Sequence, residues 1–341
     1  MKRADVLAVD GGNSKTDLAL VARDGSVLSL VRGPLSSPHH LGVDGCIAVL
    51  ERLLGDAVRE ARLEGPRVAE VAELLMAGVD FPAEEEALRE AVAELDWTSR
   101  VHVGNDTFAV LRAGTERGWG VAVTCGAGIN CVGVAPDGRH ARFPALGAIT
   151  GDWGGGYDLG LAAVSAAARS EDGRGRPTSL ERAVPAHFGL VTPSQLAEAI
   201  HTRRMDQRRV IELAPLVLSE AADDAVAAEI VQRLASEVVA LARVALTRLD
   251  LTDEPVEVLL GGGVLQDTDG DLLAAIDAEL REAAPAVTVR PTASPAIVGA
   301  ALLGLDDLGA GSEAQDRLRL QLGAAFSQLE GVAEVRRSTV G

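Results

Sequence analysis

Cysteine and lysine are both scarce in this 341-residue sequence, which contains three cysteines and two lysines. Cys46, Cys125 and Cys131 form no CxxC pair and no cluster with histidine at the spacing of a metal site. A reducing cytoplasm is therefore the compartment we expect. Since only two of the 32 basic residues are lysine, Lys15 is the single lysine beyond the extreme N-terminus.

Long apolar runs are also missing, and none approaches the roughly 18 residues that a membrane helix needs. The Met-Lys-Arg start resembles the basic region of a signal peptide, but Asp5 and Asp10 interrupt the apolar stretch that would have to follow. We expect neither export nor membrane insertion.

Several catalytic and binding signatures are absent as well. The sequence has no GxSxG elbow, no HExxH pair and no Walker A loop. The stretch "DTDGD" (267–271) begins like a calcium loop, but Ala278 occupies the twelfth position, so a helix-capping turn explains it better.

Positive charge is in deficit, because the formal net charge is −18 and the pI is about 4.8. A surface with this charge repels polyanions, so nucleic acid and anionic membranes are not expected partners. An anionic ligand would need a site made favourable locally by backbone amides, a metal ion or a few cations.

The pattern of apolar and turn residues predicts two halves with the same order of elements, without a repeat in sequence. The first half is expected to contain strands at 5–10, 17–23, 26–32, 71–77 and 100–104, and helices at 44–63, 83–95 and from Asp106. The second is expected to contain strands at 119–128, 130–138, 139–143, 256–264 and 286–290, and helices at 157–169, 179–187, 194–200, 223–249, 270–283 and 294–305.

These halves indicate an α/β protein of two facing domains around a ligand cleft. We place the domain boundaries at 1–115, completed by 294–310, and at 116–293. Residues 311–341 remain as a C-terminal helix, at about 313–330, and a tail.

The first glycine-rich turn, "VDGGNSKTD", allows two interpretations. As a binding site, the amides of Gly11, Gly12, Asn13, Ser14 and Lys15 would form an anion nest, with hydroxyl donors from Ser14 and Thr16 and a magnesium ion held through water by Asp10. As plain structure, it is a hairpin whose glycines supply positive φ.

Two further glycine turns follow strands. "TCGAGIN" (124–130) supplies the Thr124 hydroxyl together with Gly126 and Gly128, and "LLGGGV" supplies Gly261, Gly262 and Gly263. Such glycines serve helix–strand packing, or they let a ligand approach the backbone closely. Three of them at strand ends in a duplicated chain favour the ligand.

Two other segments carry candidate catalytic groups. In "HVGNDTFAVL" (102–111), Asp106 either caps a helix, as Asn105 also could, or acts as a general base. "GDWGGGYDLG" (151–160) combines two carboxylates, two aromatic residues and five glycines, a density that suits sugar binding with a stacking ring.

The order of these turns resembles the sugar kinase/actin/heat-shock-protein-70 superfamily, and more narrowly the BadF/BadG/BcrA/BcrD ATPase family, which includes N-acetylglucosamine kinases. The matching stretches are "VDGGNSKTD", "AGVDFP", "GNDTFAVL", "TCGAGINCVGV", "GDWGGGYDLG", "LLGGGV" and "SPAIVGAALL", between about residues 5 and 305. The resemblance implies two ribonuclease H-like (actin-like) domains facing across a nucleotide-binding cleft.

The resemblance also implies roles for particular residues. Asp10 would organise Mg²⁺, residues 11–16 and the second turn would surround the ATP phosphates, and the third turn would face adenosine. Asp106 would be the base. Asn105, Asn130, Asp152 and Ser37 would contact the sugar or its surroundings.

These implications predict an ATP-dependent kinase that phosphorylates a hydroxyl, O6 in our hypothesis, of an amino sugar such as N-acetylglucosamine, with a homodimer as its assembly. Two departures from the family, Trp153-Gly154-Gly155 after "GD" and Ser37 in place of asparagine, fall on the acceptor side. The alternatives are an activator ATPase, for which Cys125 and Cys131 are poorly placed to bind an iron–sulfur cluster, and a non-catalytic sugar sensor.

Overall fold

The computed structural model describes residues 4–65, 67–266, 270–292 and 294–338, with side chains in the last helix described as far as Leu329. The chain divides into two compact units, unit 1 from Met1–Trp119 with Thr292–Gly341, and unit 2 from Gly120–Pro291. Residues 267–269 of the rejected calcium-loop match lie outside the described residues.

Unit 1 is built on a five-stranded sheet in the order β3-β2-β1-β4-β5. Its strands are β1 (Val6–Gly11), β2 (Lys15–Val21), β3 (Val27–Pro34), β4 (Val71–Met76) and β5 (Arg100–Asn105). Its helices are α1 (Pro38–Ala61), α2 (Pro82–Ala93), α3 (Thr107–Gly114), α11 (Ala296–Asp307) and α12 (Ser312–Ser338). β1, β2 and β3 form an antiparallel meander, and β4 and β5 run parallel to β1.

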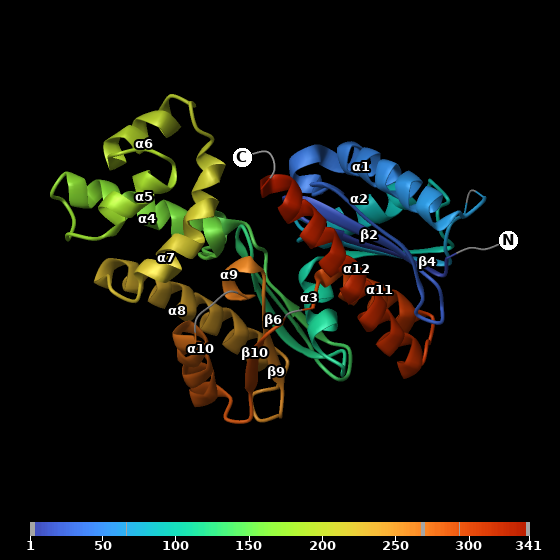
Figure 1. The fold of residues 1–341 in the computed structure, drawn as a ribbon. Helices are drawn as coiled ribbons and strands as arrows, with labels where there is room; N and C mark the ends of the chain where they lie inside the picture. The colour runs from blue at the N-terminus through green and yellow to red at the C-terminus, as the bar shows by residue number, and fades with distance from the viewer. Residues whose placement is uncertain (1–3, 66, 267–269, 293, 339–341) are drawn as a thin grey trace. The chain divides into compact units, whose positions relative to one another are not determined.

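Helices cover both faces of this sheet, which explains why β1 is apolar at nearly every position. Leu7 and Val9 of β1 pack with α1 and α2, whereas Val6 and Ala8 pack with α3, α11 and α12. Figure 1 shows α1 and α2 in blue and cyan, and α11 and α12 in red, on the two sides of the strands. The alternation along β1 follows from the two-residue period of a strand.

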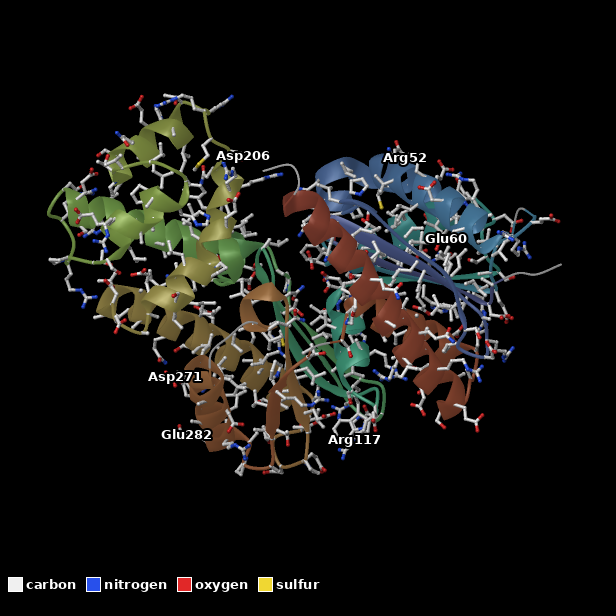
Figure 2. The ribbon with its side chains drawn as sticks, viewed as in Figure 1. Arg52, Glu60, Arg117, Asp206, Asp271 and Glu282 are labelled. Carbon is white, nitrogen blue, oxygen red and sulfur yellow. The ribbon has the colours of Figure 1, made fainter. Side chains whose placement is uncertain are left out.

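The sequence of α1 shows how these helices face the sheet. Leu50, Leu54 and Ala57 recur at helical spacing and are buried against it. Arg52 and Glu60 lie on the exposed side of the helix (Figure 2). The helix begins at Pro38, earlier than the predicted 44. Gly42, at φ +69°, forms a kink that separates the additional N-terminal residues from the rest of the helix.

Unit 2 repeats the topology with a sheet in the order β10-β9-β6-β7-β8. Its strands are β6 (Gly120–Cys125), β7 (Ile129–Val134), β8 (His140–Arg142), β9 (Glu257–Gly261) and β10 (Thr288–Pro291). Its helical segments are η1 (Gly147–Ile149), α4 (Gly155–Glu171), α5 (Leu180–His187), α6 (Pro193–His201), η2 (Gln207–Leu213), α7 (Ala214–Glu220), α8 (Ala225–Arg248), α9 (Gly263–Gln266) and α10 (Gly270–Ala283). In each unit the central strand joins an antiparallel hairpin on one side to a parallel strand on the other.

The predicted α/β fold of two similar halves is therefore confirmed. The sequence analysis missed η2 and α7, which pack with α4 through Val210, Leu213 and Val217. Within the described residues, no helix combines the length and the apolar character that crossing a membrane requires.

Gly262 provides a test of the packing in unit 2. Its φ is +83°, and an added Cβ would lie 2.3 Å from the carbonyl oxygen of Cys125. We expect Gly262→Ala to lower the unfolding free energy of unit 2 by about 2–4 kcal/mol, from backbone strain and overpacking together. Gly263→Ala is the matched control, because nothing lies within 4 Å of its added Cβ. Equal melting temperatures of the two variants in calorimetry would contradict this account.

Candidate active site

The candidate residues of unit 1 gather at one edge of its sheet. β1, β4 and β5 are parallel, so their carboxyl ends meet at the same edge. The turn between β1 and β2 lies there too, and the chain leaves β5 at this edge through Asn105 and Asp106. The structure thus brings together Asp10, residues 11–16, Asn105 and Asp106.

The hairpin turn, Gly12–Lys15, is closed by the Gly12 amide, which donates to the Lys15 carbonyl oxygen at 2.9 Å. Asn13 and Ser14 are exposed and make no hydrogen bond to other residues in the described part of the chain. Neither Gly11 nor Gly12 has positive φ. An added Cβ on Gly11 would lie 2.3 Å from Met76 Cε, so the flexible end of this side chain would have to move.

Thr16 takes part in the support of this turn. Its side chain is completely buried, and its Oγ1 lies 2.7 Å from both the Pro34 carbonyl oxygen and Ser36 Oγ. These bonds tie the start of β2 to the end of β3. Direct contact of this hydroxyl with phosphate stays a prediction.

A row of charged side chains crosses the sheet at the same edge. Asp10 of β1 is opposite Asp17 of β2, which is opposite Arg32 of β3. Arg32 donates to both carboxylate oxygens of the buried Asp17, at 2.6 and 2.9 Å. The sequence analysis missed this pair, although a carboxylate in the otherwise apolar strand "TDLALV" was a signal for it.

Asp10 has the most perturbed environment in the row. Burial, followed by the negative charges of Asp106 and Asp17, raises its pKa to about 8, although Lys15 and Arg32 act in the opposite direction. A divalent cation beside this carboxylate would offset the cost of its ionisation.

The Asp106 side chain does not cap α3, although its position in the sequence suggested that it could. Asn105 caps α3 in its place, because Asn105 Oδ1 accepts hydrogen bonds from the Thr107 amide at 3.0 Å and hydroxyl at 2.6 Å. Burial and the charge of Asp80 raise the pKa of Asp106 to about 6, whereas the backbone amides of Thr107 and Asp106 lower it. A carboxyl group with this pKa is suited to general-base catalysis near neutral pH.

The amide of Asn105 is also occupied, since Nδ2 donates to Asp80 Oδ1 at 2.9 Å and to the Val79 carbonyl oxygen at 3.3 Å. Asp80 lies within "AGVDFP", and no role was predicted for it from the sequence. Ser37 is completely buried at the start of α1, and its Oγ has no hydrogen-bond partner among the described residues. Sugar contacts by Asn105 and Ser37 stay predictions.

The second glycine turn, Gly126–Gly128, joins β6 and β7 in unit 2. It is closed by the Gly126 amide, which donates to the Gly128 carbonyl oxygen at 3.0 Å. An added Cβ on either glycine would have open space for 4 Å. The Oγ1 of Thr124 is buried and without a hydrogen-bond partner in the described part of the molecule.

The third glycine turn, Gly261–Gly263, lies beside the second, because Gly261 of β9 is paired with Thr124 of β6. Asn130 is opposite Thr124 on the other side, and its Oδ1 accepts from the Cys131 amide at 2.7 Å. Unit 2 therefore presents a hydroxyl and an amide at the positions where unit 1 has Asp10 and Asp17.

Most glycines of the 151–160 segment have packing roles. Gly155 has φ +76°, and its added Cβ would lie 2.4 Å from the Gly128 carbonyl oxygen. An added Cβ on Gly160 would lie closer still, 2.0 Å from the Val210 carbonyl oxygen in η2. Hydrogen bonds from Gly156 and Tyr157 to residues 126 and 127 fasten α4 to the second glycine turn. Close packing thus explains part of the density that suggested sugar binding.

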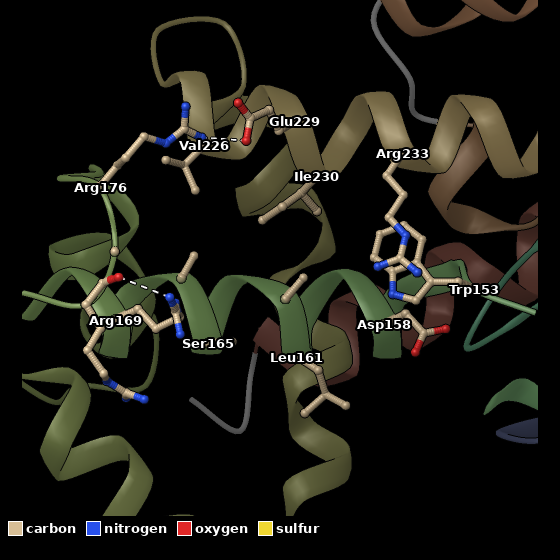
Figure 3. A pocket seen from close by; sticks show the side chains of 14 residues that line it. Trp153, Asp158, Leu161, Ser165, Arg169, Arg176, Val226, Glu229, Ile230 and Arg233 are labelled. Atoms are coloured by element: carbon tan, nitrogen blue, oxygen red, sulfur yellow. Dashed lines mark hydrogen bonds and ion pairs between the residues drawn. The ribbon is translucent and has the colours of Figure 1, made fainter. Parts of the chain in front are cut away.

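Asp152 and Trp153 precede this tightly packed helix. Asp152 Oδ2 accepts from the Thr150 hydroxyl at 2.5 Å. The Trp153 ring stacks with the Arg233 guanidinium, whose Cζ lies 4.0 Å from the ring centroid. The two side chains lie at one end of a groove of about 840 Å³ between α4 and α8 (Figure 3). Its walls are apolar at Leu161 and Ile230 and charged at the opposite end.

The residues present fit magnesium and a nucleotide. Mg²⁺ commonly keeps several waters and uses one or two carboxylates together with substrate phosphates. Within the described residues no cluster of three or more His, Cys, Asp or Glu forms an all-protein metal site. Within unit 1, the Asp10 carboxylate beside the hairpin turn matches this smaller set of ligands.

Comparison with known proteins identifies a family. The sequence pattern of the BadF/BadG/BcrA/BcrD ATPase family matches residues 7–304. The match includes each of the candidate residues described above.

Relatives and solved structures resemble the chain over most of its length. An N-acetylmuramic acid/N-acetylglucosamine kinase of Clostridium acetobutylicum is 27% identical, over 77% of this chain and 86% of its own. An N-acetyl-D-glucosamine kinase of Dictyostelium discoideum is 24% identical, over 90% and 99%. A crystal structure of a Chromobacterium violaceum protein proposed to be an N-acetylglucosamine kinase has a TM-score of 0.70 and 26% identity, covering 89% of this chain and 99% of its own.

The raised pKa of Asp10 predicts a pH-dependent stability. The pKa is about 8 in the folded protein against an ordinary 3.8, so the folded state holds the extra proton between these values. The stability of the ligand-free protein should therefore fall as pH rises through this window. Asp10→Asn should remove this fall and melt a few degrees above the parent at about pH 8.5, with a smaller gap near pH 5.5.

Thermal melts in chelator across this pH range make the measurement. Asp56→Asn, on the exposed side of α1, reports the effect of removing one negative charge elsewhere. A gap that does not change with pH, or an Asp10→Asn protein less stable than the parent, would disprove the assignment.

Proposed function

The chain belongs to the BadF/BadG/BcrA/BcrD ATPase family, and on this premise we propose that it is an ATP-dependent kinase that phosphorylates an amino sugar. N-acetylglucosamine is the proposed acceptor and O6 the proposed hydroxyl. The names of both curated relatives support the amino sugar.

One observation carries the proposal. Asp10 and Asp106 come from the ends of two strands of one sheet, and they lie close enough for the charge of Asp106 to raise the pKa of Asp10. The two carboxylates that we propose as metal ligand and general base thus lie near one exposed hairpin turn. Phosphoryl transfer requires this combination, because its catalysis depends on charge neutralisation and on positioning of the acceptor.

The hairpin turn would hold phosphate oxygens through the amides of Asn13 and Ser14 and the Lys15 ammonium group. The turns at Gly126–Gly128 and Gly261–Gly263, with the Thr124 hydroxyl, would bind the rest of the nucleotide. When bound, magnesium would neutralise phosphate charge next to Asp10. Asp106 would take the proton from the acceptor hydroxyl as it attacks the γ-phosphate in line.

Asn130 and Asp152 remain the proposed acceptor contacts of unit 2. Trp153, which replaces an acidic residue of the family pattern, would add an apolar wall there. Its position under Arg233, beside a helix fastened to the second glycine turn, supports this placement.

The activator-ATPase alternative gains no support from the cysteines. Cys125 and Cys131 are buried, and burial raises the pKa of the Cys125 thiol to about 12, which disfavours the thiolate that a cluster requires. The proposal also includes a cytoplasmic location and a homodimer; the three free cysteines agree with a reducing compartment.

Asp106→Asn tests the proposal directly. The change keeps the size of the side chain but removes the base, so sugar-dependent turnover should fall about 10²–10⁴-fold. Binding of MgATP should survive. In the parent enzyme, kcat/KM should fall as the pH drops below about 6, because the base with that pKa becomes protonated.

Glu86→Gln on the exposed surface of α2 serves as a control for loss of one carboxylate and should retain full turnover. Near-normal activity of Asp106→Asn would rule Asp106 out as the base.

A further inference from the structure

The C-terminal helix α12 lies beyond residue 304, where the family match ends, yet it is an integral part of unit 1. Leu318 and Leu322 are completely buried in the core that α11 and the sheet share. Figure 1 shows α12 along the same side of the sheet as α11.

Polar bonds fix the first half of α12 at two places. Arg317 donates to the carbonyl oxygen and the carboxylate of Asp24, at 2.9 and 2.7 Å. Arg319 donates to the carbonyl oxygens of Ala113 at 2.7 Å and Thr115 at 3.1 Å. The position and rotation of the helix on unit 1 are therefore well defined.

The following turns of α12 bring an aromatic ring to the hairpin turn. The Phe326 ring centroid lies 5.4 Å from Lys15 Nζ and 4.7 Å from Arg32 Cζ. Both distances suit cation–π attraction. Lys15 belongs to the hairpin turn, and Arg32 holds Asp17, the cross-strand neighbour of Asp10.

We propose that Phe326 is a positioning residue that holds the Lys15 ammonium group in place for phosphate binding, with the Arg32 guanidinium against the same ring. A lysine side chain loses much rotamer freedom when a ligand fixes it. A ring that already restricts Lys15 reduces this loss, and it keeps two like charges together that would otherwise separate. The inference rests on the proposed function, because it assigns Lys15 to the phosphates of ATP.

The low lysine content allows the contact to be observed without any assay of activity. Lys2 and Lys15 are the only lysines, so selective ¹³C labelling of lysine gives two side-chain signals. Lys15→Arg identifies the signal of Lys15. The ring current of Phe326 should displace this signal upfield, and Phe326→Leu should remove the displacement.

Nucleotide binding and kinetics then test the role. Phe326→Leu keeps apolar packing but removes the ring, so Kd and KM for MgATP should rise about two- to five-fold, while kcat stays within about two-fold. Phe326→Tyr should restore the parental values. Leu329→Ala, on the same helix and partly buried in the same core, should lower the melting temperature without changing KM.

The outcomes separate this inference from the proposed function. An unchanged KM in Phe326→Leu, a Tyr variant as weak as the Leu variant, or no displaced lysine signal would overturn the positioning role alone. A displaced lysine signal in a parent protein that binds no MgATP would overturn the proposed function, and the role of Phe326 in nucleotide binding with it.

Discussion

The central constraint on this structure is the crowding of carboxylates at one edge of the unit 1 sheet. Asp10 and Asp106 are both partly buried, and the charge of Asp106 makes ionisation of Asp10 harder. Arg32 neutralises the third carboxylate, Asp17. A cation bound beside Asp10 would lower the electrostatic cost of ionising this carboxyl group, so the fold itself favours a positively charged ligand at this edge.

The duplicated topology makes the chemistry of the two units easy to compare. Corresponding positions on the central hairpins carry Asp10 and Asp17 in unit 1, but Thr124 and Asn130 in unit 2. One edge therefore carries carboxylates of the kind that hold a metal ion or accept a proton. The other carries a hydroxyl, an amide, and glycines at 126, 128 and 263 with open space around them. This division agrees with a kinase, in which acidic groups serve the reacting phosphate and neutral groups serve the rest of the nucleotide.

The sequence predicted the fold well, because strand alternation, helix periodicity and glycine turns are local signals. It also led to Asp10, Asp106 and the three glycine turns. It could not show that Asn105, rather than Asp106, caps α3, since both residue types serve that role. Nor could it show that Gly155 packs on Gly128, or that Phe326 approaches Lys15, because these contacts join segments far apart in the chain.

The most direct test of the central claim is ADP release by the purified protein with magnesium and ATP, compared across N-acetylglucosamine, glucosamine, N-acetylmannosamine, N-acetylmuramic acid, glucose and no sugar. The account predicts that an amino sugar, N-acetylglucosamine above all, raises turnover by orders of magnitude over the sugar-free rate. Equal ATP hydrolysis with every sugar and with none would contradict it.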